Sequence, residues 1–189
     1  FIQTGIRPVK HAPGLLNQFD FRQRLLWVSD KEERQGQGQG RLIPLSDFLI
    51  TAIQNYIEYI NQFAVLHNVI YPNDQFPLDD ILNSKQPIIQ LFSKNPKGFS
   101  GIAPSKIRYQ TRHFFSHQDN WLRHQLRSML TNKSPEHLIC ALYGHEHPDQ
   151  EAMHPMSSLS INELKELSSD LDKVAVELNL RQVEVNVYG

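Results

Sequence analysis

The clearest pattern of apolar and polar positions lies just after Ser46. Apolar side chains recur there at helical spacing along one face: Phe48, Leu49, Ile50, Ile53, Tyr56, Ile57, Ile60, Phe63 and Ala64. Serine is a favoured N-cap residue because its hydroxyl accepts a hydrogen bond from an amide of the first helical turn. The pattern therefore predicts a long amphipathic helix that begins after Ser46.

A β-hairpin is predicted before that helix. Residues 19–30 have the pattern of a turn followed by a strand, and residues 41–45 that of a returning strand. Between them, residues 35–40 place glycine at every second position, which is typical of a flexible tip. The tip lies between two strands with no helix to present amides to a pyrophosphate, so it is not a nucleotide-binding loop. We expect Trp27 in the core.

The second half of the chain is predicted to be mainly helical. Residues 71–86 are expected to be irregular, and residues 87–92 to form a short strand. Two helices are expected over residues 104–115 and 119–131. A third begins with Ser134 as N-cap and Pro135 at the first helical position, and ends at Gly144.

Ser160 and Glu163 have the spacing of a capping box and predict the start of a last helix. Its apolar face consists of Leu164, Leu167, Leu171, Val174 and Leu178. Valines then alternate with polar residues in 181–189, which favours a strand or a docking tail. Together these elements predict an α+β, mainly helical fold: a helical bundle with a small antiparallel sheet on one side.

Composition narrows the class of protein. A length of 189 residues with 40% hydrophobic and 21% charged residues suits one ordinary domain with a core of its own, or one domain with a small appendage. No apolar run approaches the roughly 20 residues of a membrane span. Cys140 is the only cysteine, which excludes an internal disulfide and favours a cytoplasmic location. The chain starts at Phe1 without an initiator methionine, so we interpret it as a piece of a longer protein.

Charge is distributed unevenly although the net charge is only -1. Between residues 94 and 133 the only acidic residue is Asp119, whereas the basic residues there are Lys94, Lys97, Lys106, Arg108, Arg112, Arg123, Arg127 and Lys133. A basic segment in a neutral protein is either a solvated face or a binding surface for a polyanion.

Arg123 and His145 are the leading candidates for chemistry. Arg123 lies within one predicted helix, and His145 directly follows the end of the next. Side chains in these positions can converge on one phosphate group. A planar guanidinium binds two phosphate oxygens at once, and imidazole supplies another donor or a proton shuttle.

Arg123 and His145 belong to a series of four short motifs. The pattern that contains these motifs covers most of the chain, from Thr4 to about Leu180. They are Thr4-Gly5-Ile6-Arg7-Pro8, the hairpin with Lys31, Asn120-Trp121-Leu122-Arg123-His124, and Leu142-Tyr143-Gly144-His145. This order resembles the catalytic domain of tyrosine recombinases, the phage-integrase family. The resemblance implies a bacterial or phage-related protein of DNA recombination or integration that binds duplex DNA and can form a homo-oligomer on it.

The resemblance also implies roles for single residues. Arg7 and Arg123 would clamp the phosphate, Lys31 would protonate the leaving 5′ oxygen, and His145 would donate to a phosphate oxygen. This chemistry needs no metal or cofactor, because the cationic groups stabilise the charge that develops on the phosphate. DNA contacts are expected from the basic residues Lys97, Lys106, Arg108, Arg112 and Arg127.

Several positions depart from the family pattern. Asn120 stands where the family has a histidine, and an amide can donate a hydrogen bond but cannot relay a proton. Lys10 and His11 stand where an acidic residue is usual. The nucleophilic tyrosine is replaced in the stretch 154–156 by His-Pro-Met, which leaves Tyr188 as the candidate nucleophile, since Tyr143 is expected in the core. Either an unusual nucleophile cuts DNA, or the protein binds DNA without cutting; the missing tyrosine favours the second case.

Two other functions remain open at this point. The last helix and the tail over residues 181–189 could dock a protein partner. Alternatively, the loop that carries His145, His147, Asp149 and His154 could hold a metal ion for hydrolysis, since imidazole and carboxylate are suitable ligands for zinc and similar ions.

Overall fold

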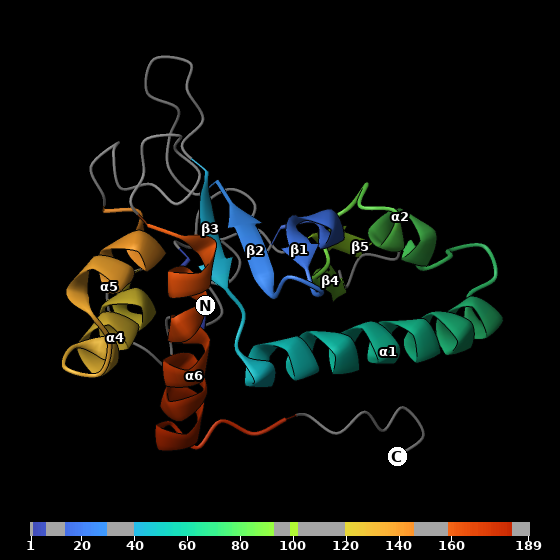
Figure 1. Ribbon diagram of the computed structural model, residues 1–189. Helices are drawn as coiled ribbons and strands as arrows, with labels where there is room; N and C mark the ends of the chain where they lie inside the picture. The colour runs from blue at the N-terminus through green and yellow to red at the C-terminus, as the bar shows by residue number, and fades with distance from the viewer. Residues whose placement is uncertain are drawn as a thin grey trace.

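The structure, a computed structural model, describes residues 2–6, 14–29, 40–92, 99–101, 120–145 and 159–182. The described part is α+β and mainly helical, as predicted, with five α-helices, a three-stranded sheet and a two-stranded sheet, both antiparallel (Figure 1). The elements, in chain order, are the 3-10 helix η1 (Leu16–Gln18), β1 (Phe19–Asp20), β2 (Leu25–Val28), β3 (Arg41–Pro44), α1 (Asp47–Ile70), α2 (Leu78–Leu82), β4 (Gln90–Phe92), β5 (Phe99–Gly101), α4 (Trp121–Leu130), α5 (Glu136–Tyr143) and α6 (Ile161–Glu177). The glycine-rich tip, the helix expected over 104–115 and the valine-containing tail lie outside the described residues.

The predicted hairpin is confirmed. Strands β2 and β3 pair antiparallel, with Leu25 opposite Pro44 and Val28 opposite Arg41. Residues 19–20 are not part of a turn, however, because they form β1 and add a third strand beside β2.

The expectation that Trp27 lies in the core is wrong. Successive side chains of a strand point to opposite faces, so burial of Leu26 and Val28 turns Trp27 outward. The Trp27 side chain is 39% exposed. Its indole packs over the backbone of Gly40, where a Cβ atom would lie only 2.0 Å from Trp27 Cζ2.

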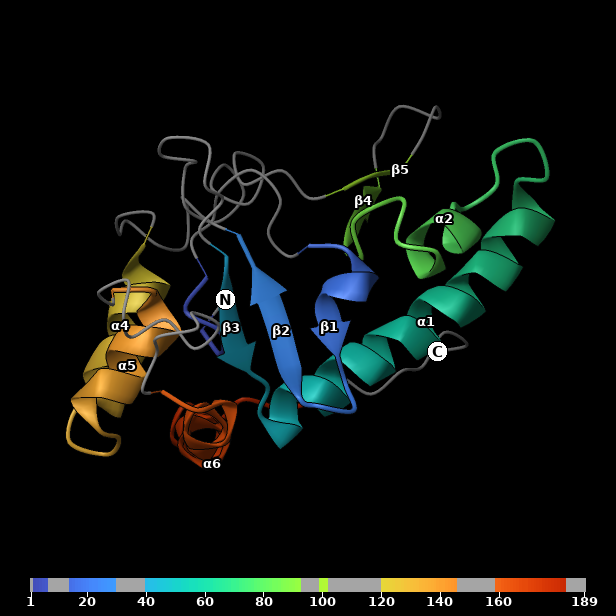
Figure 2. The same ribbon diagram turned by 45° about the horizontal axis from the view of Figure 1, so that its top comes forward.

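The main hydrophobic core lies between β2–β3 and the helices α4, α5 and α6. Figure 2 shows these three helices gathered on the β3 side of the sheet. Apolar residues three or four apart on each helix fill the core: Leu126 and Leu130 of α4, Leu138, Ile139 and Leu142 of α5, and Leu164, Leu167, Leu171 and Val174 of α6. The predicted apolar face of α6 is therefore the buried one.

Helix α1 joins this main core to a second, smaller one. Leu49 and Ile50 in its first turns pack against the main core, whereas Ile60 and Ala64 belong to a separate cluster. Both views show α1 running away from α6 toward α2 (Figures 1 and 2). The second cluster also contains Phe76 and Ile81, and Ile81 lies on α2, within a segment that we expected to be irregular. No helix in the described part of the chain has the length and apolarity needed to cross a membrane.

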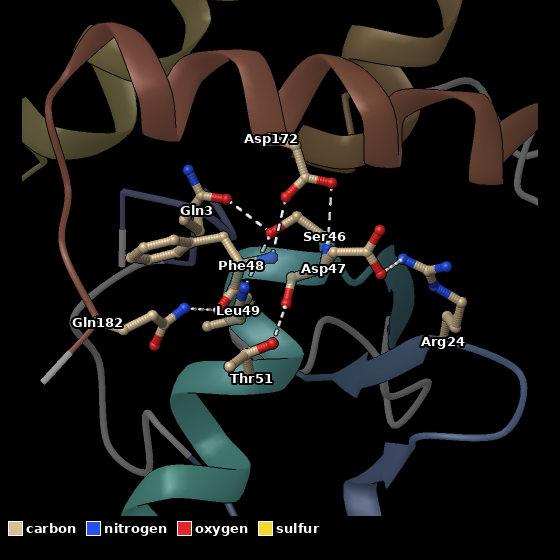
Figure 3. A network of polar contacts seen from close by, with 9 residues as sticks. All are labelled: Gln3, Arg24, Ser46, Asp47, Phe48, Leu49, Thr51, Asp172 and Gln182. Atoms are coloured by element: carbon tan, nitrogen blue, oxygen red, sulfur yellow. Dashed lines mark hydrogen bonds and ion pairs between the residues drawn. The ribbon is translucent and has the colours of Figure 1, made fainter. Parts of the chain in front are cut away.

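Side chains from three segments form a polar network at the start of α1 (Figure 3). Ser46 accepts a hydrogen bond from the Leu49 amide (3.1 Å), which confirms the predicted N-cap. Asp172 of α6 accepts from the amides of Asp47 (3.1 Å) and Phe48 (2.9 Å). Gln3 links the N-cap of α1 to α6, since its side chain accepts a hydrogen bond from the Ser46 hydroxyl (2.8 Å) and donates one to the Leu171 carbonyl (3.1 Å). Of the first-turn amides that a helix cannot satisfy internally, that of Leu49 is thus bonded to the neighbouring Ser46, and those of Asp47 and Phe48 to an aspartate distant in sequence.

The caps of the later helices match the sequence patterns except at one position. Ser160 and Glu163 form the predicted capping box of α6, and Gly144 ends α5 with φ +58°. The N-cap of α5 is Pro135 and not Ser134. The Ser134 hydroxyl instead donates to Asp170 of α6 (2.7 Å), a contact that depends on how the two helices pack.

We predict that Asp172→Ala lowers the free energy of unfolding by about 1 to 2 kcal/mol, the usual cost of losing an N-cap acceptor. The physical reason is that two first-turn amides of α1 lose their carboxylate acceptor. Urea denaturation would measure the change, with Glu166→Ala at an exposed position of the same helix as the control. Equal stability of the two variants would show that the contact with α1 contributes nothing.

Candidate functional site

Arg123 and His145 lie side by side in the structure. Arg123 Nη2 is 3.4 Å from Nε2 of His145, although the two residues belong to different segments. The Arg123 side chain belongs to α4 and is buried, whereas His145 follows the C-cap residue Gly144 of α5 and is exposed. The pair therefore places a fixed guanidinium next to an imidazole that solvent reaches.

Backbone carbonyls hold the Arg123 guanidinium in place. It donates to the Tyr143 carbonyl (2.7 Å) and to the Gly5 carbonyl. The Tyr143 carbonyl belongs to the last turn of α5, where carbonyls lack helical partners and the helix dipole is negative. A cation is therefore favoured at this helix end, and the left-handed turn at Gly144 carries the chain from there to His145.

The segment before Arg7 lies against the same pair of helices. Thr4 and Ile6 are buried, and Gly5 between them has φ +56°, a conformation that favours glycine. A Cβ atom at Gly5 would lie 3.4 Å from Tyr143 Cζ and 3.5 Å from Leu126 Cδ2. Arg7 itself lies outside the described residues. Two residues before it, the Gly5 carbonyl accepts a hydrogen bond from Arg123.

The hairpin is also attached to the end of α5. Arg41, the first residue of β3, donates from Nε to the Leu142 carbonyl (2.9 Å). Two guanidinium groups, from Arg41 and Arg123, thus bond to consecutive carbonyls of the last turn of α5. The sequence patterns predicted no role for Arg41 beyond its position as the first residue of the returning strand. Lys31, at the other end of the hairpin tip, lies outside the described residues.

Tyr143 lies at the centre of this arrangement. Its ring is buried, as predicted, and the Arg123 guanidinium lies 4.2 Å from the ring centroid in a cation–π contact. Its hydroxyl donates to the Arg123 carbonyl (2.6 Å). Burial raises the pKa of Tyr143 to about 12, against the opposing effect of the nearby arginines. Tyr143 is therefore a neutral hydrogen-bond donor at physiological pH and not an activated nucleophile.

The other two described candidates are placed less centrally. Asn120 is the N-cap residue of α4, and its side chain makes no capping hydrogen bond there. Arg127, one turn after Arg123, forms an ion pair with Glu136 of α5 and lies 5.7 Å from the Tyr143 ring centroid. The ion pair ties α4 to α5, so Arg127 has a packing role in addition to any contact with a ligand.

The remaining candidates lie outside the described residues. These are Lys97, Lys106, Arg108, Arg112, Tyr188, His147, Asp149 and His154. Within the described ranges, no group of three His, Cys, Asp or Glu side chains is arranged to hold a metal ion.

Comparison with known proteins identifies no relative of this chain. No protein-family model matches it, and neither a curated protein nor a solved structure matches significantly. Functional conclusions therefore depend on the geometry of the site and on the sequence motifs.

We predict that native Tyr143 stays protonated until about pH 12. The pKa in the folded protein is above the ordinary value of 10.0, so folding favours the neutral phenol. This contribution to stability is complete below about pH 10 and is lost as the pH rises toward 12. The tyrosinate absorbance of the wild-type protein and of Tyr143→Phe, together with their stability against pH, would test this. Ionisation of Tyr143 near pH 10 in the folded protein would contradict it.

Proposed function

We propose that this chain is a tyrosine-recombinase-like protein that binds duplex DNA without cutting it and acts in DNA recombination or integration. In this proposal Arg123 and His145 bind one backbone phosphate. The observation that carries the proposal is the 3.4 Å approach of Arg123 Nη2 to His145 Nε2, next to the end of α5. An arginine and a histidine at this separation suit recognition of a single phosphate group.

Preorganisation of the guanidinium supports the proposal. Two backbone carbonyls and one aromatic ring fix the Arg123 side chain before any ligand arrives. Side-chain ordering on binding costs about 0.5 to 1.5 kcal/mol for a long side chain, so a guanidinium that is already ordered binds more tightly. His145 is exposed, which gives a phosphate a route to the pair from solvent.

The positions of the other motifs also support it. The carbonyl of Gly5, two residues before Arg7, accepts a hydrogen bond from Arg123. The base of the hairpin that carries Lys31 is bonded to Leu142 through Arg41. Segments that are far apart in the sequence and resemble three different recombinase motifs thus meet at the motif that contains His145.

Two observations on tyrosines support binding without cleavage. The stretch 154–156 lacks the tyrosine of the family pattern, and the high pKa of buried Tyr143 removes it as a nucleophile. Tyr188 in the tail is the remaining candidate, and it must be tested directly.

We expect duplex DNA binding to weaken steeply with salt, because phosphate neutralisation releases counterions. Arg123→Gln should weaken binding about tenfold or more and lower the slope of log affinity against log salt by about 0.9, the share of one phosphate contact. Fluorescence anisotropy with a short labelled duplex would measure both quantities.

Arg22→Gln is the matched control, since it removes the same charge from an exposed turn outside the site. Thermal melting of both variants would separate loss of binding from loss of folding. DNA affinity that is independent of salt, or equally weakened in both variants, would refute the phosphate-binding role of Arg123.

A nicked duplex that traps covalent intermediates should yield no protein–DNA adduct with the wild-type chain. The expectation follows from the lack of an activated tyrosine in the positions discussed above. Denaturing gel electrophoresis would detect an adduct, with Tyr188→Phe as the comparison. An adduct that forms with the wild-type chain and disappears in Tyr188→Phe would overturn the proposal of binding without cutting. It would show instead that Tyr188 cleaves DNA.

A further inference from the structure

Tyr143 and Arg123 contact each other in three separate ways. The Arg123 guanidinium lies 4.2 Å from the Tyr143 ring centroid and donates to the Tyr143 carbonyl at 2.7 Å. In return, the Tyr143 hydroxyl donates to the Arg123 carbonyl at 2.6 Å. The main chain and the side chain of each residue are thereby fixed to the other, so the guanidinium cannot move independently of the ring.

We propose that Tyr143 is a positioning residue. It holds the Arg123 guanidinium next to His145, in the geometry that binds phosphate. This inference rests on the function proposed above. It assigns a specific task to a residue that the sequence predicts only as part of the core. Tyr143 acts through Arg123 and does not itself contact the phosphate.

The neighbours of the Tyr143 ring support this role. The ring lies against Gly5, where a Cβ atom would approach Tyr143 Cζ to 3.4 Å, and its centroid is 5.9 Å from that of His145. The Arg127 guanidinium lies 5.7 Å from the ring centroid, farther than that of Arg123 at 4.2 Å. The ring therefore contacts or adjoins three described parts of the site: the N-terminal segment, both arginines of α4 and the histidine after α5.

The hydroxyl separates a positioning role from simple packing. Phenylalanine would keep the ring and the carbonyl acceptor but would lose the bond to the Arg123 carbonyl. Leucine would also lose the ring face beneath the guanidinium. If Tyr143 positions Arg123, DNA affinity should fall in the order wild type, Tyr143→Phe, Tyr143→Leu, and the effect should depend on Arg123 being present.

A double-mutant cycle on the whole chain would test this with a short labelled duplex. Tyr143→Phe should weaken binding about threefold or more in the protein that contains Arg123, as expected for loss of one hydrogen bond. It should have no effect in the Arg123→Gln background. Tyr143→Leu should show the same dependence with a larger loss, and the Phe cycle suffices if the Leu variant does not fold. Tyr56→Phe is the matched control, since its hydroxyl contacts the Gln90 amide (3.4 Å) at the second cluster.

The outcomes are distinct. Loss of affinity that vanishes without Arg123 supports the positioning role. The same loss in both backgrounds, or no loss in the protein that contains Arg123, overturns it and leaves Tyr143 as a core residue. If Arg123→Gln binds DNA as tightly as the wild type, the proposed function itself fails, and the positioning role falls with it.

Discussion

The described structure depends most on the hydrogen bonds that the buried Arg123 guanidinium makes to the carbonyls of Gly5 and Tyr143. These bonds connect the N-terminal segment, α4 and the end of α5 at one point. Hydrogen bonds from a charged donor contribute about 1.5 to 3 kcal/mol, and a buried carbonyl that loses its donor is costly. Removal of the guanidinium would leave carbonyls from two segments without this donor, so the same group that suits a phosphate also holds three segments together.

A second set of contacts fixes the long helix relative to this point. Ser46 and Asp172 accept hydrogen bonds from the first amides of α1, and Gln3 bonds Ser46 to the Leu171 carbonyl of α6. The far half of α1 carries a separate hydrophobic cluster. Because the two clusters share α1, its capped end determines how the smaller cluster sits relative to the main core.

The proposed phosphate site rests on contacts between described residues, whereas His147, Asp149 and His154 of the alternative metal site lie outside the described ranges. Arg123 and His145 are adjacent, and cationic or donor groups of this kind stabilise an anion. Arg41 reinforces the positive character of the region by bonding the carbonyl next to the one that Arg123 bonds. The comparisons with known proteins add no family to this, so the recombinase-like function remains a proposal that rests on motif order and on these contacts.

Sequence alone determined the features that depend on near neighbours in the chain. The N-cap at Ser46, the capping box at Ser160 and the stop at Gly144 were predictable, because caps involve residues within one helical turn. The hairpin and the apolar faces of α1 and α6 were predictable from periodicity, and the order of motifs led to Arg123 and His145.

Only the tertiary structure decided features that join residues far apart in sequence. The bond from Asp172 to the start of α1, the bond from Arg41 to Leu142 and the reciprocal contacts of Tyr143 with Arg123 are of this kind. The physical reason is that hydrogen bonds and ring contacts depend on distances of a few ångströms. The periodicity of a sequence specifies which face of an element is buried, but it does not specify which residue of another element lies opposite.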